Sequence, residues 1–292
     1  MKNLCLFALV GTLTLLAGCQ RQPAGVPLGD GLRSFDARGV IREIAADGRK
    51  AVIRHEEIPG YMEAMTMQLE VKDTNELVNL RPGDQINFRL LVTDTDAWID
   101  HVQKTGAGVE VAAVATPAAP SLKELNPGDP LLDCILTNQL GRTIQLSDFK
   151  GGALAFTFIF TRCPLPTYCP RMNHHFAAVQ TALLAGQAGT NWQLLSISFD
   201  PEFDTPARLL NYAADHNYDL DHWSFATGTE ANIRQLGGAF GLAYWRLGGT
   251  FNHNVRTVVV DAAGRVQKIF PNNEWQPAEL VEEMKKAMAA KN

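Results

Sequence analysis

Apolar and polar residues alternate along short stretches in the first third of the chain. An alternation of period two is typical of half-buried β-strands, and Asp47-Gly48 between two of the stretches is a strong signal for a hairpin turn. No helical period is convincing in this region. The pattern predicts a small closed β-barrel, with strands over residues 38–44, 50–55, 65–71, 85–92 and 97–103.

After residue 120 the pattern changes, because strand-like and helix-like stretches now follow one another. Strands are expected in an opening hairpin, in two buried stretches and in a closing hairpin, over residues 131–136, 144–146, 153–160, 192–199, 255–260 and 265–270. Helical spacing predicts helices over residues 173–185, 205–216, 229–240 and 277–289, with Asp204 as the N-cap of the second. This order predicts an α/β thioredoxin-like domain with an additional N-terminal hairpin.

The N-terminus has the layout of an export signal, because Lys2 precedes an apolar run over residues 4–17 that is too short to span a bilayer. The run ends in Leu16-Ala17-Gly18-Cys19, which resembles the lipobox of bacterial lipoproteins. The resemblance implies removal of residues 1–18, lipid on Cys19 and a membrane anchor that faces the periplasm. Gln20 leaves both the inner and the outer membrane open.

Composition then divides the rest of the chain. We expect a Pro- and Gly-rich tether over residues 19–33, the first domain over 34–105, an Ala- and Pro-rich linker over 106–120 and the second domain over 121–292. A net charge of −5 with mixed signs gives no reason to expect nucleic acid as a partner. Five cysteines are few for a disulfide scaffold. Of these, Cys134 is predicted to be buried and unreactive.

Two cysteines lie on the predicted loop between a buried strand and a helix, where Cys163 and Cys169 are separated by five residues. Pro170 suits the first position of the helix, which would place Cys169 at the helix N-terminus. The partial positive charge of a helix N-terminus would favour the Cys169 thiolate. Thiolates are nucleophiles, disulfide formers and soft-metal ligands. A structural disulfide is the alternative, although closing so short a loop would remove little entropy from the unfolded chain.

A histidine far along the chain is a further candidate. His253 lies just before the predicted closing hairpin, and in a thioredoxin-like layout that segment faces the cysteine loop. An exposed loop histidine is the alternative interpretation. His174 and His175, which follow the cysteines directly, are competing ligands that spacing does not exclude.

The second domain resembles the SCO/SenC family, thioredoxin-fold copper proteins of cytochrome c oxidase assembly. The resemblance runs from about residue 129 to the C-terminus and rests on His253 and on the segments 137–141, 158–164, 169–170, 198–202 and 204–206. It implies that Cys163, Cys169 and His253 bind copper. The usual family spacing has three residues between the cysteines, whereas this chain has five.

The first domain contains a second set of soft donors. Strand alternation places Met65 and Met67 on one face, and His55 lies on the corresponding face of an earlier strand. Packing of methionines in a core is the alternative, but thioethers with an imidazole suit Cu(I). The first domain resembles the periplasmic CusF-type domain, an OB-like small barrel that binds Cu(I) through one histidine and two methionines. The resemblance rests on His55, on Pro59 and on the segments 39–41, 64–67 and 80–84. Where that family has a stacked tryptophan this chain has Met62, preceded by Tyr61, and either could complete the site.

Together these features favour a membrane-anchored copper chaperone over an enzyme. The resemblance implies delivery of copper to the copper-site subunit of cytochrome c oxidase or to another acceptor. One alternative is a thiol-disulfide oxidoreductase that keeps the cysteines of a target copper site reduced, although a Cys-x-x-Cys signature is absent. Another is a copper- or redox-responsive binding protein.

Overall fold

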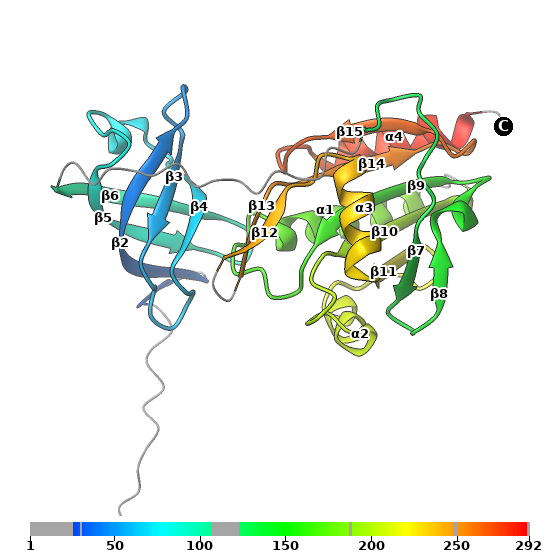
Figure 1. The fold of residues 1–292 in the computed structure, drawn as a ribbon, viewed down its shortest axis with the longest axis horizontal. Helices are drawn as coiled ribbons and strands as arrows, with labels where there is room; N and C mark the ends of the chain where they lie inside the picture. Colours follow the sequence, from blue (N-terminus) through cyan, green and yellow to red (C-terminus); the bar gives the residue numbers. More distant parts are fainter. Residues whose placement is uncertain (1–25, 30, 107–122, 187–188, 248–249, 291–292) are drawn as a thin grey trace, which may run out of the picture.

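The computed structural model describes residues 26–29, 31–106, 123–186, 189–247 and 250–290. These residues form two domains that lie side by side (Figure 1). The predicted signal peptide, the lipidation site Cys19 and most of the predicted linker lie outside the described residues. Among the described helices, none is both long and apolar enough to cross a membrane.

The first domain consists almost entirely of strands. Its elements are β1 (Val26–Gly29), β2 (Leu32–Ile44), β3 (Lys50–His55), β4 (Met65–Glu70), the short 3-10 helix η1 (Thr74–Leu77), β5 (Gln85–Val92) and β6 (Ala97–Gly106). The strands form an antiparallel sheet in the order β4-β3-β2-β5-β6, with β1 paired to β2. A parallel bridge between Val71 and Ile99 brings the end of the β4 segment against β6. The predicted small all-β domain is confirmed, and its strands begin within the range predicted as tether.

Alternation along the strands builds the core of this domain, where Ile41, Ile53 and Ile99 are fully buried. The β2–β3 turn contains Gly48 at a φ of 68°, which suits a glycine. Gly39 is required for a different reason. A Cβ atom there would lie 2.7 Å from Cγ2 of Ile53 and 2.8 Å from the backbone oxygen of Arg54, so β2 can approach β3 only because residue 39 lacks a side chain.

The second domain alternates strands and helices around one sheet. Its elements are β7 (Ile135–Asn138), β8 (Thr143–Gln145), η2 (Leu146–Phe149), β9 (Ala153–Ile159), α1 (Cys169–Ala185), β10 (Trp192–Ser198), α2 (Pro206–Ala214), β11 (Trp223–Thr227), α3 (Glu230–Ala239), β12 (Tyr244–Leu247), β13 (Thr250–His253), β14 (Thr257–Val260), β15 (Val266–Phe270) and α4 (Pro277–Ala289). The sheet order is β15-β14-β9-β10-β11-β7-β8, with β9, β10 and β11 parallel. This confirms the thioredoxin-like prediction.

The central strand β9 is buried along its whole length, which explains its continuous apolar run. Helices α1 and α4 pack against each other and both contact β9 (Figure 1). The start of α1 therefore lies near the carboxyl end of β9, at the end of the parallel strands and not beside an edge strand. The cysteine loop, residues 161–168, connects them there.

The second domain contains two secondary-structure features that the sequence analysis does not predict, strand β11 and the hairpin of β12 and β13. β11 has five residues, four of them buried, and so it shows neither strand alternation nor helical spacing. The hairpin of β12 and β13 is short and pairs Tyr244 with His253. His253 consequently ends a strand, where the sequence predicts a loop.

The predicted cap of α2 is wrong. Thr205 is the N-cap, and its hydroxyl accepts a hydrogen bond from the backbone N–H of Arg208. Asp204 is buried instead, where its carboxylate accepts hydrogen bonds from the backbone N–H of Thr161 at 3.0 Å and from the Ser198 hydroxyl at 2.5 Å. A buried carboxylate needs such donors, so Asp204 anchors the cysteine loop and leaves the helix cap to its neighbour.

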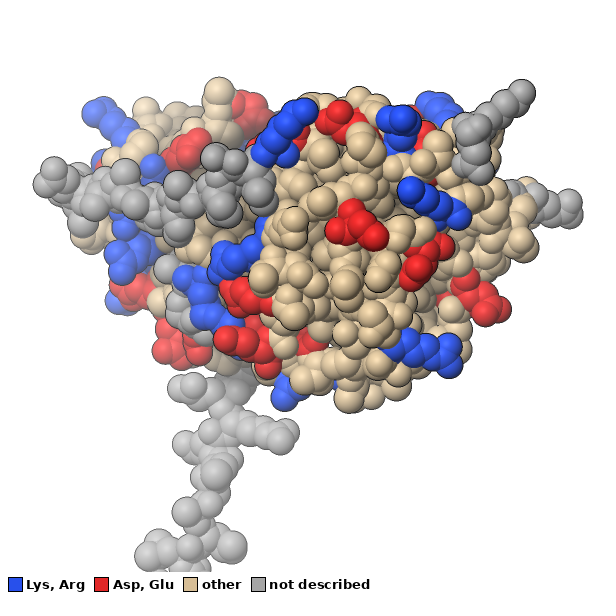
Figure 2. All heavy atoms as spheres, turned by 45° about the vertical axis from the view of Figure 1, so that its right-hand side comes forward, with Lys and Arg blue, Asp and Glu red and all other residues tan. Residues whose placement is uncertain are grey.

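The two domains touch through the cysteine loop and through two strands. Leu165 of the loop is only 5% exposed and belongs to the apolar core of the first domain. β4 lies against β13 (Figure 1). Ion pairs flank this contact, one between Lys50 and Glu274 and one between Arg171 and Asp96 at 3.3 Å. On the face in view in Figure 2, acidic and basic side chains are interspersed.

Candidate metal centre

The cysteine loop carries two thiols at the start of a helix. Cys163 lies early in the loop, and Cys169 is the first residue of α1, with Tyr168 as the N-cap and Pro170 in the first turn. The loop is compact, because the backbone N–H of Tyr168 donates to the oxygen of Leu165 at 3.1 Å. Cys163 is partly buried and Cys169 is buried. Both are free thiols in this structure.

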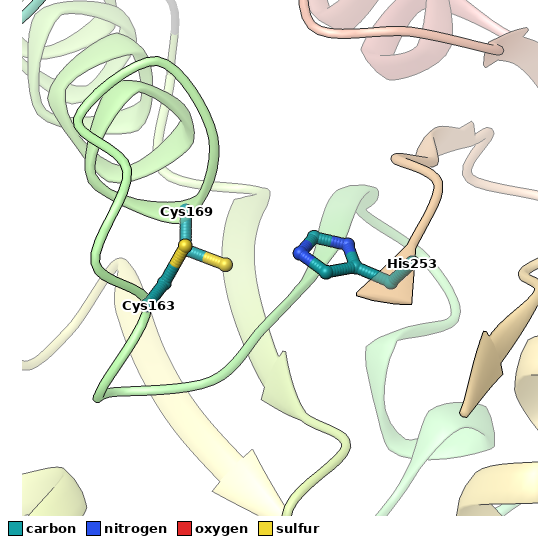
Figure 3. A group of neighbouring side chains, drawn as sticks. All are labelled: Cys163, Cys169 and His253. Atoms are coloured by element: carbon teal, nitrogen blue, oxygen red, sulfur yellow. The ribbon is translucent and has the colours of Figure 1, made fainter. Parts of the chain in front are cut away.

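His253 approaches these thiols from β13 (Figure 3). Its Nδ1 atom lies 2.8 Å from the backbone oxygen of Asn254, which can only accept, so Nδ1 carries the proton. The Nε2 lone pair is then available to a ligand. The rings of Phe160, Tyr168 and Phe199 surround the imidazole, with centroid distances of 5.5, 5.5 and 5.1 Å.

One ligand atom from each of Cys163, Cys169 and His253 lies within 4.8 Å of the other two. Two sulfurs and one imidazole nitrogen form a soft donor set, which suits Cu(I) or another thiophilic ion better than magnesium or calcium. Among the described His, Cys, Asp and Glu side chains, this is the group that could hold a metal ion.

The two thiols have opposite acidities. Burial opposes ionisation of Cys163, but interactions with Cys169 and His253 outweigh it and hold the pKa of Cys163 well below its usual value. Burial and then the neighbouring Cys163 raise the pKa of Cys169. The expectation that the helix start favours a Cys169 thiolate is therefore wrong, because burial and the neighbouring Cys163 act in the opposite direction. The direction of these pKa shifts favours a thiolate at Cys163 over one at Cys169.

The competing histidines point elsewhere. His174 packs against His216, with ring centroids 6.0 Å apart, and His175 packs against Trp275 at 4.8 Å. Neither belongs to the group of potential metal ligands. Cys134 does not belong to this group either, and burial raises the pKa of that thiol to about 11.

The first domain brings its own candidate donors together. β3 and β4 pair so that His55 is directly opposite Met65 and Ile53 is opposite Met67, which places both thioethers beside the imidazole on one buried face. Nδ1 of His55 lies 2.6 Å from the backbone oxygen of Glu56, whereas its Nε2 is buried and has no hydrogen-bond partner. A buried nitrogen without a partner is costly, and a metal ion would satisfy it.

Met62 and Tyr61 have different surroundings. Met62 is buried in the same core cluster as Met65 and Met67. Tyr61 stacks on Phe35 at a centroid distance of 4.4 Å, and its hydroxyl donates to the backbone oxygen of Pro164 at 2.7 Å. This role of Tyr61 has no signal in the sequence, because its partner lies in the other domain.

Comparison with known proteins assigns both halves of the chain. Residues 133–289 match the SCO1/SenC family, and residues 34–104 match the family described as copper binding periplasmic protein CusF. A curated SCO1 protein homolog of Bacillus subtilis (strain 168) is 37% identical over 91 residues, which are 31% of this chain. The match spans 45% of that relative, less than half of its length.

A solved structure of a relative gives the same assignment for the second domain. BsSco, described as a member of the Sco family of cytochrome c oxidase assembly proteins with a disulfide switch, is 27% identical with a TM-score of 0.50. The similarity covers 57% of this chain and 98% of that chain. Bradyrhizobium japonicum ScoI with copper bound is 25% identical with a TM-score of 0.47, over 55% of this chain and 99% of that chain.

Proposed function

We propose, from the finding that this chain belongs to the SCO1/SenC family, that it is a copper chaperone. The observation that carries the proposal is the convergence of Cys163, Cys169 and His253 within 4.8 Å, although His253 is on a separate hairpin. Reduced thiols and an imidazole bind Cu(I), and a disulfide between the same cysteines would remove both thiolates. The redox state of the pair therefore controls loading.

The first domain supports the proposal with a second donor set. His55, Met65 and Met67 lie on paired strands within a region that matches a copper-binding family, and Met62 is buried in the same cluster. Thioether sulfurs do not need to lose a proton and select Cu(I). Each domain would then hold copper through its own residues.

Copper would leave the chain for a protein acceptor. The relative BsSco is described as a member of a family of cytochrome c oxidase assembly proteins, which favours the copper-site subunit of that oxidase as the acceptor. The chaperone would work in the periplasm, anchored to a membrane by lipid on Cys19. An anchored carrier and a membrane-bound acceptor share one surface, which shortens the search between them.

A second candidate function is thiol-disulfide exchange. The lowered pKa of Cys163 favours it, because a thiolate is the attacking species. Cys163 would attack a target disulfide and Cys169 would resolve the mixed disulfide, leaving two target thiols and an oxidised Cys163–Cys169 pair. Reduction of glutathione disulfide by the copper-free reduced chain, lost in Cys163→Ser, would support this function. Exchange no faster than that of Cys163→Ser would exclude it.

Metal analysis of the purified chain tests the chaperone proposal. The reduced chain should bind one copper in each domain, and the oxidised chain should retain only the copper of the first domain. Cys163→Ser should match the oxidised chain, whereas Cys134→Ser, a control on a buried cysteine outside the site, should match the reduced wild type. Full copper content in the oxidised chain or in Cys163→Ser would contradict the site.

A further inference from the structure

We infer that the cysteine loop docks the first domain over the thiol site, so that Cu(I) passes between the two donor sets inside one interdomain cavity. The inference rests on the proposed function, since it supplies the route between two copper sites in one chain. It assigns a partner to the loop, and that partner is the first domain of the same chain.

The loop contributes an apolar anchor to the first domain. Leu165 lies between the two cysteines, is 5% exposed and forms part of the core cluster that contains Met62, Met65 and Met67. A leucine side chain taken out of water in this way stabilises the contact by the ordinary hydrophobic effect. Cys163 and Tyr168 contact the apolar cores of both domains. The metal-binding loop is therefore also the interface.

A hydrogen bond and two ion pairs orient the contact around this anchor. The Tyr61 hydroxyl donates to the backbone oxygen of Pro164, the residue that follows the first cysteine. Lys50 and Arg171 pair across the interface with Glu274 and Asp96 at the periphery. Exposed ion pairs are individually weak, but such pairs fix the register of two docked surfaces.

The strands that carry the donors also meet. β4 holds Met65 and Met67 and is an edge strand of its sheet, while β13 holds His253 and lies against β4. A cavity of about 550 Å³ lies at the contact, and its lining includes Met65, Met67, Cys163 and His253. Two donors of each set thus face the same partly open cavity.

Transfer through this cavity is a ligand exchange. Cu(I) leaves the thioethers of Met65 and Met67 and the imidazole of His55, and it gains the sulfurs of Cys163 and Cys169 and Nε2 of His253. The ion remains Cu(I) and no electron moves, while each proton present on the Cys163 and Cys169 thiols is released to solvent. The thiolate set binds more tightly, so copper moves toward the second domain.

Docking also affects the protein acceptor. Because Pro164 and Leu165 are covered by the first domain, an acceptor that needs the thiol site must displace that domain. The first domain and the acceptor then compete for the same loop. Copper is shielded from solvent chelators until the acceptor arrives.

The test measures how much copper escapes during transfer in the full chain. The oxidised chain is loaded with one equivalent of Cu(I), which only the first domain can hold, and a phosphine then reduces the disulfide in the presence of bathocuproine disulfonate. The wild type should lose little copper to this chelator. Leu165→Ser should increase the captured fraction about tenfold, since it removes a buried leucine from the contact. Tyr61→Phe, which removes one hydroxyl, should increase it about fivefold.

A matched leucine provides the control, because Leu184 on α1 is 47% exposed. Leu184→Ser should behave as wild type, and small-angle X-ray scattering should show a larger radius of gyration for Leu165→Ser only. Equal capture in Leu165→Ser, Tyr61→Phe and Leu184→Ser, with both sites loading normally, would overturn the docking inference and leave the proposed function standing. Failure of either site to load copper in the wild type would overturn both.

Discussion

The hydroxyl of Tyr61 in the first domain donates a 2.7 Å hydrogen bond to the backbone oxygen of Pro164, the residue after Cys163 in the second domain. Tyr61 also stacks on Phe35 of its own domain, which fixes the orientation of its ring while the hydroxyl contacts the second domain. Burial raises the pKa of this phenol and outweighs the opposing charge of Arg33, so the hydroxyl remains a donor at neutral pH. A change in the conformation of the cysteine loop would therefore alter or break a contact made by the first domain.

Replacement of His253 tests which histidine completes the thiol site. We expect His253→Ala to weaken Cu(I) binding at that site by more than about tenfold, because the loss of even an outer partner of a metal ligand costs that much. His174→Ala and His175→Ala should bind as wild type, since both rings pack against other aromatic rings. Competition titration with a Cu(I) chelator measures these affinities. Weaker binding in His174→Ala or His175→Ala, with His253→Ala unchanged, would contradict the assignment.

The acidity of Cys163 predicts selective alkylation. In the reduced, copper-free chain, iodoacetamide should modify Cys163 first at neutral pH, because the pKa of its thiol is lowered whereas those of Cys169 and Cys134 are raised. His253→Ala should slow this reaction, since it removes one of the neighbours that lower the pKa of the Cys163 thiol. Peptide mass spectrometry over a time course gives the rate at each cysteine. Faster labelling of Cys134 than of Cys163 would contradict the predicted order of alkylation.

The close approach of β2 and β3 predicts a cost for any side chain at residue 39. Gly39→Ala should lower the free energy of unfolding by about 1–3 kcal/mol, because the new Cβ would overlap Ile53 and the backbone at Arg54. Gly106→Ala is the control, since its Cβ would meet only the flexible side chain of Gln85. Thermal unfolding measures both variants. His55 faces Gly39 across the strands, so Gly39→Ala should also weaken copper binding by the first domain.

Acid should destabilise the second domain through His216. Burial, and then His174, lower the pKa of His216 to about 4, below the value near 6.5 of an unfolded histidine. Between these values the unfolded chain binds the proton and the folded chain does not, so stability is lost as the pH falls from about 6.5 to 4. Urea unfolding across this range should show a smaller loss for His216→Phe. His101→Phe, at a side chain that is 64% exposed, should retain the full loss.

Local sequence patterns account for much of both sites. Alternation alone places His55, Met65 and Met67 on buried strand faces, and the structure pairs His55 with Met65 directly. The apolar run before the cysteines predicts the buried strand β9, and Pro170 indicates where α1 starts. Such features are predictable because strand and helix periods depend on neighbouring residues. Short elements such as β11 escape this approach, since a strand buried on both faces has no alternation.

The sequence by itself determined the two sets of donors and the type of domain that carries each. Spacing left His174 and His175 as competitors of His253, which only the family resemblance favoured. The tertiary structure supplies the physical reason for that choice, because the hairpin of β12 and β13 brings a residue distant in sequence to the thiols. Likewise, only the structure placed Leu165 in the core of the first domain. A loop residue between two cysteines carries no local period, and its burial is decided by a surface folded from another part of the chain.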